Sequence, residues 1–391
     1  MRCVACECGD LDVFFESLQV PVCCNFSHDT PAEARSVPRG DIRLGYCRKC
    51  GMIHNVAFDE KRVEYTVGYE NSLHGSARFQ EFAEKLAQRL VDKYDLHGVD
   101  VFEIGPGRGE FLDLLCRAGG NRGVGYDPSA PEEDAEVPGR PFRIVRELFD
   151  PEHTRVQARL VCSRHVLEHV SQPRAFAEML GRARSHSPDV AVYVEVPNAL
   201  WTLRDLGVWD IIYEHCSYFT PTSLYALMVA GGLGAVSVRE EFGGQFLSIE
   251  TESGTARDEV VPPGALAELT RLVEAFGDRY RQELSGWNRR LAAAGRDGRR
   301  LAIWGGGAKG VTFLNSVDDP RAVACVVDIN PRKQGKFVAG TGLPIVGPEE
   351  ALRDHRVSEI IVVNPFYLDE IRTSVQGLGF TGAVRGIDDH S

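Results

Sequence analysis

A glycine-rich turn between an apolar run and a helical run constrains the fold of this chain more than any other feature. Residues 101–109 read Val-Phe-Glu-Ile-Gly-Pro-Gly-Arg-Gly, and Asp127 ends a second apolar run. Glycine has no Cβ, so such a loop lets a ligand approach the backbone closely, and a carboxylate after the second strand can accept both hydroxyls of a ribose. The pattern predicts a βαβ nucleotide-binding unit that contacts its ligand through Gly105, Gly107, Gly109 and Asp127. The alternative is an ordinary glycine turn in an α/β protein.

Strand-like and helix-like segments alternate around this turn, which predicts a parallel sheet with helices on both faces. We expect strands at 99–104, 123–126, 142–145, 159–162 and 190–196, and helices at 79–94, 109–118, 175–184 and from about 221. Two later strands, 236–241 and 246–251, are separated by little more than Gly243-Gly244. They predict an antiparallel hairpin at one edge of the sheet.

Ligands of parallel sheets bind at the carboxyl ends of the strands. Residues 163–169 follow the fourth expected strand, so Arg164 and His165 should lie near the ligand and His169 should face the pocket. If this segment is helical, His165 and His169 share one face, a spacing that can bind metal. We discount a metal because the segment should point at the ligand of the glycine loop. A solvated or capping histidine is the alternative for His165.

A second polar cluster follows the fifth expected strand. Asn198 ends that strand, and Tyr213, Glu214 and His215 come shortly after it. A phenol, a carboxylate and an imidazole in succession form a plausible acid–base group, and histidine is the usual base near neutral pH. The alternative is a set of residues that covers the end of the sheet, with His215 only hydrogen-bonded.

Cysteines concentrate at the N-terminus, where seven of the eleven lie in the first fifty residues. Two Cys-x-x-Cys pairs can close a tetrahedral Zn²⁺ site that leaves no position for substrate, so its role would be structural. The predicted ligands are Cys3, Cys6, Cys47 and Cys50. Cys8 could replace Cys6, His54 could replace Cys50, or the thiols could be reduced without metal. The adjacent Cys23 and Cys24 are expected to be packed or incidental thiols.

The composition narrows the classes of partner. Lys and Arg number 44 against 56 Asp and Glu, a net charge of −12, which argues against nucleic acid as the main partner. The chain has no apolar run of about 18 residues, which excludes a membrane span, and no signal-like N-terminus. We therefore expect a cytoplasmic protein of two or three domains, with a monomer favoured.

The last third of the chain repeats the strand–glycine–helix pattern. Residues 263–298 look like a helical connector, and strand 301–304 then enters Gly305-Gly-Gly-Ala-Lys309. This turn could bind a phosphate with Lys309 as counter-charge, and strands 323–327 and 359–363 would continue a small parallel sheet. A scaffold without a ligand is the alternative. A dehydrogenase function is disfavoured, because Asp328 is the only acidic residue placed where it could bind the ribose of a nucleotide cofactor.

Several motifs give the chain a family resemblance. The Glu103-x-Gly-x-Gly-x-Gly loop lacks the dinucleotide-binding spacing and resembles the first motif of class I S-adenosylmethionine-dependent methyltransferases. The whole chain resembles the three-domain sugar C-methyltransferases that modify nucleotide-linked keto-deoxysugars. The resemblance rests on the paired cysteines, Tyr69-Glu-Asn-Ser, the glycine loop, Glu-Val-Pro-Asn198, Tyr213-Glu-His215-x-Ser-Tyr218 and Trp304-Gly-Gly-Gly-Ala-Lys309-Gly310.

The resemblance implies an α/β protein with a class I methyltransferase sheet between two flanking units. These are a zinc module over 1–62, the methyltransferase domain over 63–254 and a Rossmann-like domain over 255–391 that closes over a nucleotide-sugar. It implies S-adenosylmethionine and a structural Zn²⁺ as cofactors. Cofactor contacts would come from Glu103, Gly105, Gly107, Gly109, Asp127, Arg164 and His165, and substrate contacts from Asn198 and Lys309.

The resemblance also assigns catalytic roles. His215 would remove a proton beside the ketone, Glu214 would orient it, and Tyr69 or His169 would hold the enolate oxygen. Family members carry Tyr-His-Glu-His before Ser-Tyr, whereas here Tyr213 is followed directly by Glu214. This shorter segment puts the role of Tyr213 in question and keeps methylation of another small metabolite, on carbon, oxygen or nitrogen, as the alternative. A non-catalytic binding protein is a third reading.

Overall fold

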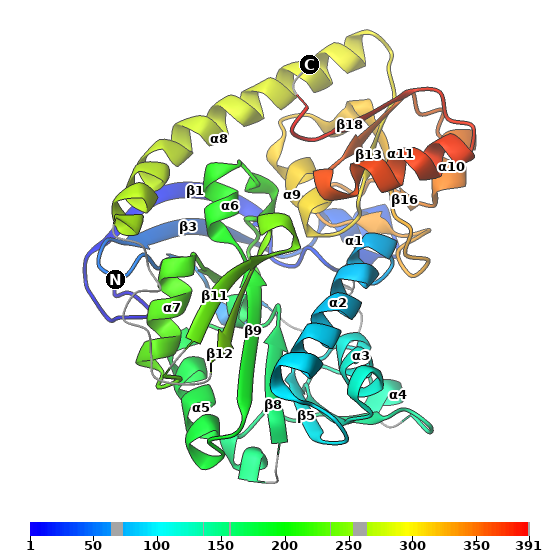
Figure 1. The fold of residues 1–391 in the computed structure, drawn as a ribbon. Coiled ribbons are helices and arrows are strands. Elements are labelled where there is room, and N and C mark those ends of the chain that lie inside the picture. The colour runs from blue at the N-terminus through cyan, green and yellow to red at the C-terminus, as the bar shows by residue number, and fades with distance from the viewer. Residues whose placement is uncertain (64–72, 136, 156–157, 235, 253–263, 390–391) are drawn as a thin grey trace.

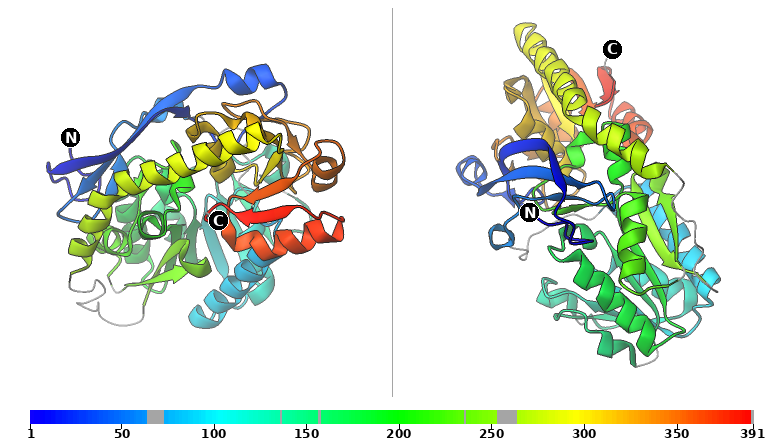
Figure 2. Two further views of the ribbon diagram at one scale, coloured as in Figure 1. Left: turned by 90° about the horizontal axis from the view of Figure 1, so that it is seen from above. Right: turned by 90° about the vertical axis from the view of Figure 1, so that its left-hand side faces the viewer.

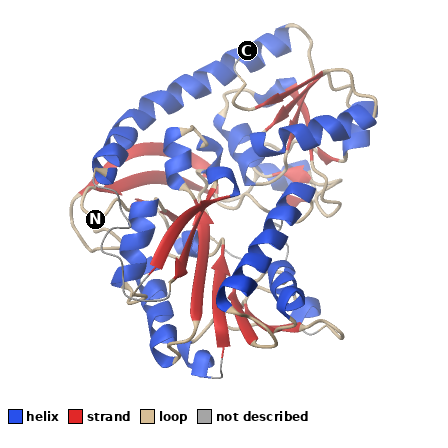
Figure 3. Ribbon diagram, viewed as in Figure 1, coloured by secondary structure: helices blue, strands red, loops and turns tan. Residues whose placement is uncertain are grey.

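The computed structural model describes residues 1–63, 73–135, 137–155, 158–234, 236–252 and 264–389 (Figure 1). In these residues the strands form three larger sheets and one two-stranded ribbon, with helices packed around them (Figure 3). None of the described helices is both long enough and apolar enough to cross a membrane.

The central sheet has seven strands in the order β11-β12-β9-β8-β5-β6-β7. Their bounds are β5 Asp100–Ile104, β6 Arg122–Tyr126, β7 Phe142–Val145, β8 Ala158–Arg164, β9 Ala191–Pro197, β11 Val236–Glu241 and β12 Phe246–Thr251. All neighbouring pairs are parallel except those made by β12, which runs antiparallel to β9 and β11. The predicted edge hairpin is confirmed, with Val236 opposite Thr251.

Helices cover both faces of this sheet, as the alternating pattern predicts. Helix α2 (Ala77–Tyr94) and α3 (Glu110–Gly119) share one hydrophobic core, and α5 (Pro173–His186) and α7 (Pro221–Ala230) share another. The buried residues of α2 recur every three or four positions, the spacing of one helix face. Its N-cap is Ser76, whose hydroxyl accepts the Phe79 amide at 3.3 Å. The short helices α4 (Glu132–Ala135) and α6 (Ala199–Arg204) complete this part.

The N-terminal part holds a sheet that the cysteine spacing did not reveal. β1 (Leu11–Pro21) pairs with β3 (Arg39–Cys47), and β4 (Ile53–Asn55) pairs on the other side of β3. The fourth strand is β10 (Ser217–Tyr218), which begins two residues after His215 and pairs with β4. The helix here is α1 (Pro31–Arg35). The segment that carries His215 is therefore part of the N-terminal sheet.

The C-terminal part is a second parallel sheet, in the order β16-β14-β13-β17-β18. Its strands are β13 Leu301–Trp304, β14 Val323–Val327, β16 Ile345–Val346, β17 Glu359–Val362 and β18 Ala383–Gly386, and its helices are α9 Ala308–Ser316, α10 Pro348–Arg353 and α11 Leu368–Gly377. The predicted strand–glycine–helix start at β13 and α9 is confirmed.

Helix α8 (Ala265–Arg296) joins the two ends of the molecule. In Figure 2 it extends from beside the N-terminal strands to the C-terminal domain. Near one end, Phe276 packs edge-on against Phe15 at 5.4 Å between ring centroids, and near the other Trp287 packs against Phe313 of α9 at 5.1 Å. A ribbon between β2 (Ser27–His28) and β15 (Phe337–Val338) adds a second link. The three sheets are thus tied together by shared apolar packing.

Candidate active site

The glycine loop lies at the carboxyl end of β5, in the middle of the central sheet. Gly105, Gly107 and Gly109 have φ values of 68°, 56° and 80°, the left-handed region that glycine adopts without strain. A Cβ on Gly105 would lie 2.4 Å from Val166, and one on Gly109 would lie 2.3 Å from Phe142. A Cβ on Gly107 would meet no atom of the described residues within 4 Å. Two of the glycines are therefore required by packing, and Gly107 is the one that faces open space.

Asp127 follows β6 and holds this loop. One carboxylate oxygen accepts the Gly107 amide at 3.2 Å, and the other accepts the Ser129 amide at 2.9 Å and its hydroxyl at 2.6 Å. A carboxylate offers about four acceptor positions, so one stays available for a ligand hydroxyl. The structure thus brings Gly107 and Asp127 together, as the sequence predicts.

Glu103 lies on β5 beside the loop and is 3% exposed. Burial raises the pKa of its carboxyl to about 7, against the opposing effect of the Arg164 guanidinium. Its Oε2 has no hydrogen-bond partner among the described residues. Glu103 therefore offers a free acceptor atom at the expected cofactor position.

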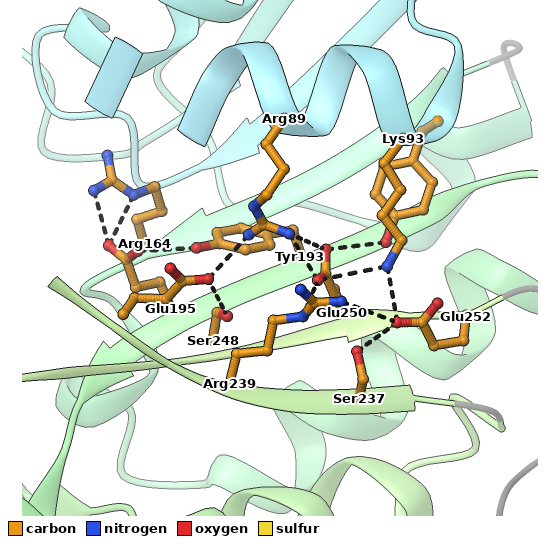
Figure 4. Close-up of polar contacts among 12 residues, drawn as sticks. Arg89, Lys93, Arg164, Tyr193, Glu195, Ser237, Arg239, Ser248, Glu250 and Glu252 are labelled. Carbon is orange, nitrogen blue, oxygen red and sulfur yellow. Dashed lines mark hydrogen bonds and ion pairs between the residues drawn. The ribbon is translucent and has the colours of Figure 1, made fainter. Parts of the chain in front are cut away.

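Arg164 is held by a buried carboxylate, Glu195 on β9 (Figure 4). The same carboxylate also lies beside His165. Arg164 places Nε at 2.9 Å and Nη2 at 2.8 Å from Glu195 Oε1, and the Tyr193 hydroxyl donates to Oε2 at 2.9 Å. Burial alone would raise the pKa of Glu195, but Arg164, His165 and Tyr193 lower it to about 2. Glu195 is therefore ionised, and it contacts all three of these side chains at the end of the sheet.

A neighbouring network fixes the edge hairpin to α2 (Figure 4). Glu250 on β12 is fully buried and is contacted by Arg89 at 2.8 Å and by Arg239 at 3.0 Å. Arg89 also reaches Glu241 at 3.0 Å. The charge of this second buried carboxylate is likewise compensated by cations. Among the described residues of this network, no charge is left unpaired on the sheet face under α2.

His165 does not lie in a helix, so the predicted helical spacing of 165–169 is wrong. Its φ is 53°, and the 3-10 turn η3 begins after it, at Leu167–His169. Its ring lies between two carboxylates, with Nε2 3.2 Å from Glu195 and Nδ1 3.4 Å from Glu168. Burial lowers the pKa of His165, but these carboxylates outweigh it and raise the pKa to about 9. His165 is therefore an imidazolium at neutral pH.

A polar cluster near Glu195 is formed by Glu168, His169 and His215, and it is called the pocket below. One ligand-type atom of each lies within 4.8 Å of the others, and the two imidazole centroids are 4.9 Å apart. Burial, and then His169, lower the pKa of His215 to about 3, so its imidazole is neutral at neutral pH. His169 Nδ1 lies 3.0 Å from the backbone oxygen of Glu214. The predicted proximity of His169 and His215 is thus present.

Tyr213 and Glu214 turn away from His215 and into the N-terminal part. The Tyr213 hydroxyl accepts the Asp59 amide at 3.0 Å, and its ring lies 5.5 Å from that of Phe58. Glu214 Oε2 accepts the Cys24 amide at 3.0 Å, and burial raises the pKa of its carboxyl to about 7. The three consecutive residues therefore do not form one acid–base group, because Tyr213 and Glu214 anchor the segment that presents His215.

The two predicted substrate contacts are engaged within the protein. Asn198 caps α6, where its side-chain oxygen accepts the Leu200 amide at 3.0 Å and its amide donates to the Gly244 carbonyl at 2.8 Å. The Lys309 ammonium pairs with Asp210, at the start of the segment that leads to His215. Tyr69 lies outside the described residues.

The four predicted zinc ligands meet between the ends of β1 and β3. The sulfurs of Cys3 and Cys50 are 3.6 Å apart, as are those of Cys6 and Cys47. All four lie within 4.8 Å of one another, and Cys8 and His54 are not in this group. The set is thiolate-only, which suits a closed tetrahedral Zn²⁺ site.

Comparison with known proteins shows the family to which this chain belongs. Residues 75–238 match the family model described as a methyltransferase domain, and residues 265–383 match the C-methyltransferase C-terminal domain. The chain is 30% identical to the C-methyltransferase NovU of Streptomyces niveus over 285 residues, which cover 68% of this chain and 67% of that protein. The chain belongs to the C-methyltransferase family. It is an S-adenosylmethionine-dependent methyltransferase with a class I sheet.

Solved structures that are similar to this C-methyltransferase match less than half of its chain. An O-methyltransferase family protein from Burkholderia thailandensis is 18% identical over 46% of this chain and 59% of that one, with a TM-score of 0.33. Human N-acetylserotonin methyltransferase in complex with S-adenosylmethionine is 15% identical over 45% of this chain and 53% of its own, with a TM-score of 0.35.

Three residues of the C-methyltransferase site were given no role by the sequence. Glu195 was hidden in the apolar run of β9, although a carboxylate in a strand that is buried on both faces is itself a signal. Glu168 was hidden because the helical spacing favoured the two histidines. Cys24 contributes through its backbone amide, which donates to Glu214. The sequence carries no signal for such a backbone contact.

Gly107 of the C-methyltransferase gives a direct test of the cofactor loop. A Gly107→Ala change should raise the dissociation constant for S-adenosylmethionine at least about tenfold, because the methyl group enters the space open to the ligand. Calorimetric titration measures this. Gly98→Ala is the matched control, since Gly98 has a φ of 67° and also meets no atom within 4 Å. If both variants lost affinity for S-adenosylmethionine equally, the cause would be backbone strain and not obstruction of the ligand by the added methyl group.

Proposed function

We propose that this enzyme methylates a carbon beside the ketone of a nucleotide-linked 4-keto-deoxysugar through an enolate. The observation that carries the proposal is His215, a neutral imidazole in a half-buried pocket next to a buried carboxylate. A ketone acidifies the proton on the adjacent carbon, and removing that proton requires an unprotonated base placed at the substrate.

The pocket supports His215 in this role. Its low pKa keeps the imidazole free of protons, and Glu168 lies close enough to stabilise the imidazolium that forms when the substrate proton arrives. His165 in turn keeps Glu168 charged, because its imidazolium lies 3.4 Å from that carboxylate. The base thus works beside a fixed negative charge, an arrangement that favours proton transfer to it.

The oxygen of the enolate needs a hydrogen-bond donor. His169 is poorly suited to this role, because the Glu214 carbonyl can only accept, which fixes the proton on Nδ1 and leaves Nε2 as an acceptor. Burial also lowers the pKa of His169, so a second proton is disfavoured. We therefore propose that Tyr69 supplies the donor.

The glycine loop and Asp127 fit the cofactor, since Gly107 faces open space and Asp127 keeps acceptor capacity. We propose that S-adenosylmethionine is held by Glu103, Gly105, Gly107, Gly109 and Asp127. Arg164 and His165 would shape this site indirectly, through their contacts with Glu195. When bound, S-adenosylmethionine supplies a sulfonium methyl group, which bonds to the substrate carbon as its bond to sulfur breaks. The residues of the pocket would position the substrate carbon for this transfer.

We propose that the nucleotide part of the substrate binds toward the C-terminal domain. There Asp328 accepts the Gly306 amide at 2.9 Å, which holds the second glycine turn at the N-terminus of α9. Lys309 keeps a fifth of its side chain exposed while it pairs with Asp210. Because an ammonium has three N–H donors, Lys309 can contact a phosphate without leaving Asp210. Asn198 would act by fixing the sheet end and not by touching the sugar.

The alternative substrate is another small metabolite that is methylated on carbon, oxygen or nitrogen. It is favoured by one observation: the shortened segment places Tyr213 against Asp59, away from His215.

We further propose that the four-cysteine group binds one structural Zn²⁺. Cys3 and Cys47 are almost fully buried, and the group lies where β1 and β3 begin and end. A Zn²⁺ there would tie the first residues of the chain to the sheet that also holds β10, and so would stabilise the segment that carries His215.

The role of His215 can be tested by His215→Asn. Turnover should fall by about 10²–10⁴-fold, the usual contribution of general base catalysis, while S-adenosylmethionine still binds. The measurement is methyl transfer to a panel of nucleotide-linked 4-keto-6-deoxysugars, with the donor affinity measured by calorimetry.

Tyr213→Phe is the control for this test. It removes one hydrogen bond to Asp59 from the adjacent anchor and should cost about 1 kcal/mol of stability with turnover nearly unchanged. Normal turnover by His215→Asn would remove His215 as the base.

The zinc site can be tested by Cys47→Ser. The purified wild type should contain about one zinc per chain, and the variant should lose it together with most soluble expression. Elemental analysis by mass spectrometry measures the zinc. Cys8→Ser is the matched control, since Cys8 is in the same module but outside the four-sulfur group. Loss of zinc in Cys8→Ser but not in Cys47→Ser would contradict the assigned ligands.

A further inference from the structure

We propose that Asp134 is a positioning residue for S-adenosylmethionine, which fixes the glycine loop by holding the side chain of Arg108. Arg108 stands between Gly107 and Gly109 in the loop, and its Nη1 lies 2.6 Å from Asp134 Oδ2. This role rests on the part of the proposed function that places the cofactor at the glycine loop. It does not depend on the sugar, on the enolate or on His215.

Asp134 is a buried carboxylate in the short helix α4, which follows β6. The residue is 8% exposed, and each of its two oxygens lies near an arginine. Oδ2 accepts from Arg108, whereas Oδ1 lies 3.6 Å from Arg140 Nη1. A carboxylate that is removed from water needs such compensation by cations. The two arginines therefore hold Asp134 in one place between them.

Arg140 links Asp134 to a second residue beside the loop. Its guanidinium carbon lies 5.4 Å from the ring centroid of Phe142, a cation–π distance. The Phe142 ring fills the space next to Gly109, where an added Cβ would lie only 2.3 Å from it. Asp134 is thus joined to the loop directly through Arg108 and indirectly through Arg140 and Phe142.

Two cross-links join the loops that follow β5 and β6. One is the hydrogen bond from the Gly107 amide to Asp127 Oδ2 at 3.2 Å, and the other is the ion pair between Arg108 and Asp134. β5 and β6 are parallel neighbours, so both loops leave the same edge of the sheet, where the ligands of such sheets bind. The glycine loop is therefore held at two adjacent residues.

This fixation matters because the loop contains three glycines. Glycine allows the backbone more conformations than any other residue, so a loop without cross-links would lose more conformational entropy when it binds a ligand. Ordering a loop before the ligand arrives lowers this cost and raises affinity. Asp134 supplies such order through Arg108, without a contact to the cofactor of its own.

Calorimetric titration of the purified full chain with S-adenosylmethionine tests the proposal. Asp134→Asn should raise the dissociation constant about fivefold or more, a modest loss because a third of the Arg108 side chain is exposed and the pair is partly screened. Asp100→Asn is the matched control. It breaks an ion pair with Arg122 of 2.7 Å between the same two strands, at their opposite, amino ends, and should leave the dissociation constant unchanged.

Two further variants separate positioning from a general loss of stability. Arg108→Gln removes the same contact as Asp134→Asn, so the double variant should bind the donor no more than about twofold more weakly than either single variant. Arg108→Lys keeps a cation for Asp134 and should recover most of the affinity that Arg108→Gln loses. Fully additive losses, or no recovery with lysine, would contradict a role through this pair.

S-adenosylhomocysteine distinguishes positioning from a direct effect of charge. It lacks the sulfonium charge and keeps the adenosine part that the loop would hold. Its affinity should therefore fall by the same factor as that of S-adenosylmethionine in Asp134→Asn. A loss confined to S-adenosylmethionine would mean that the unpaired Arg108 repels the sulfonium, and it would overturn the positioning role.

If Asp134→Asn does not fold, Arg108→Gln carries the test, because it changes the more exposed partner of the pair. Unchanged donor affinity in the folded variant, or an equal loss in Asp100→Asn, would overturn the proposal. Gly107→Ala reports separately on whether the loop holds the cofactor. Because every measurement here is donor binding, a failure of the proposed sugar chemistry would leave the result for Asp134 intact.

Discussion

The charge on Glu195 is the constraint on which the pocket depends. A carboxylate with no solvent exposure is stable only when it is paired, and removing one partner of a buried pair costs about 3–5 kcal/mol. Arg164, His165 and Tyr193 supply that compensation from β8, the turn after it and β9. The consequence reaches the reaction site, because the imidazolium of His165 then stands beside Glu168, and Glu168 stands beside His215. Charges thus alternate from the buried sheet end to the base.

The segment that carries His215, the proposed base, is held by all three parts of the chain. Asp210 is paired with Lys309 of the C-terminal domain, Tyr213 and Glu214 are held by the backbone of the N-terminal part, and β10 completes the N-terminal sheet. A class I sheet alone would leave this segment without anchors. If His215 is the base, the flanking domains help to build the reaction site. Helix α8 and the shared core hold these domains in place.

The sequence predicted the central sheet, its edge hairpin and the glycine turns because these follow from local apolar periodicity and from glycine's backbone freedom. It also predicted which cysteines meet, since ligand spacing is a local signal. It missed the N-terminal strands, whose pairing with β10 joins residues far apart in the chain. It grouped Tyr213 and Glu214 with His215 because they are consecutive, yet their side chains bind different neighbours. Such orientations depend on tertiary contacts, as does the left-handed turn at His165.

Exchange of substrate hydrogen for solvent deuterium tests the central claim, carbon-acid chemistry at His215, most directly. The enzyme would be incubated in deuterium oxide with a nucleotide-linked 4-keto-6-deoxysugar and S-adenosylhomocysteine, and then with a methyl-labelled donor. The account predicts that deuterium enters the unreacted sugar beside the ketone without a donor, that His215→Asn abolishes this exchange, and that the label then appears on that carbon. A labelled methyl group on oxygen or nitrogen, with no deuterium in the sugar, would contradict it.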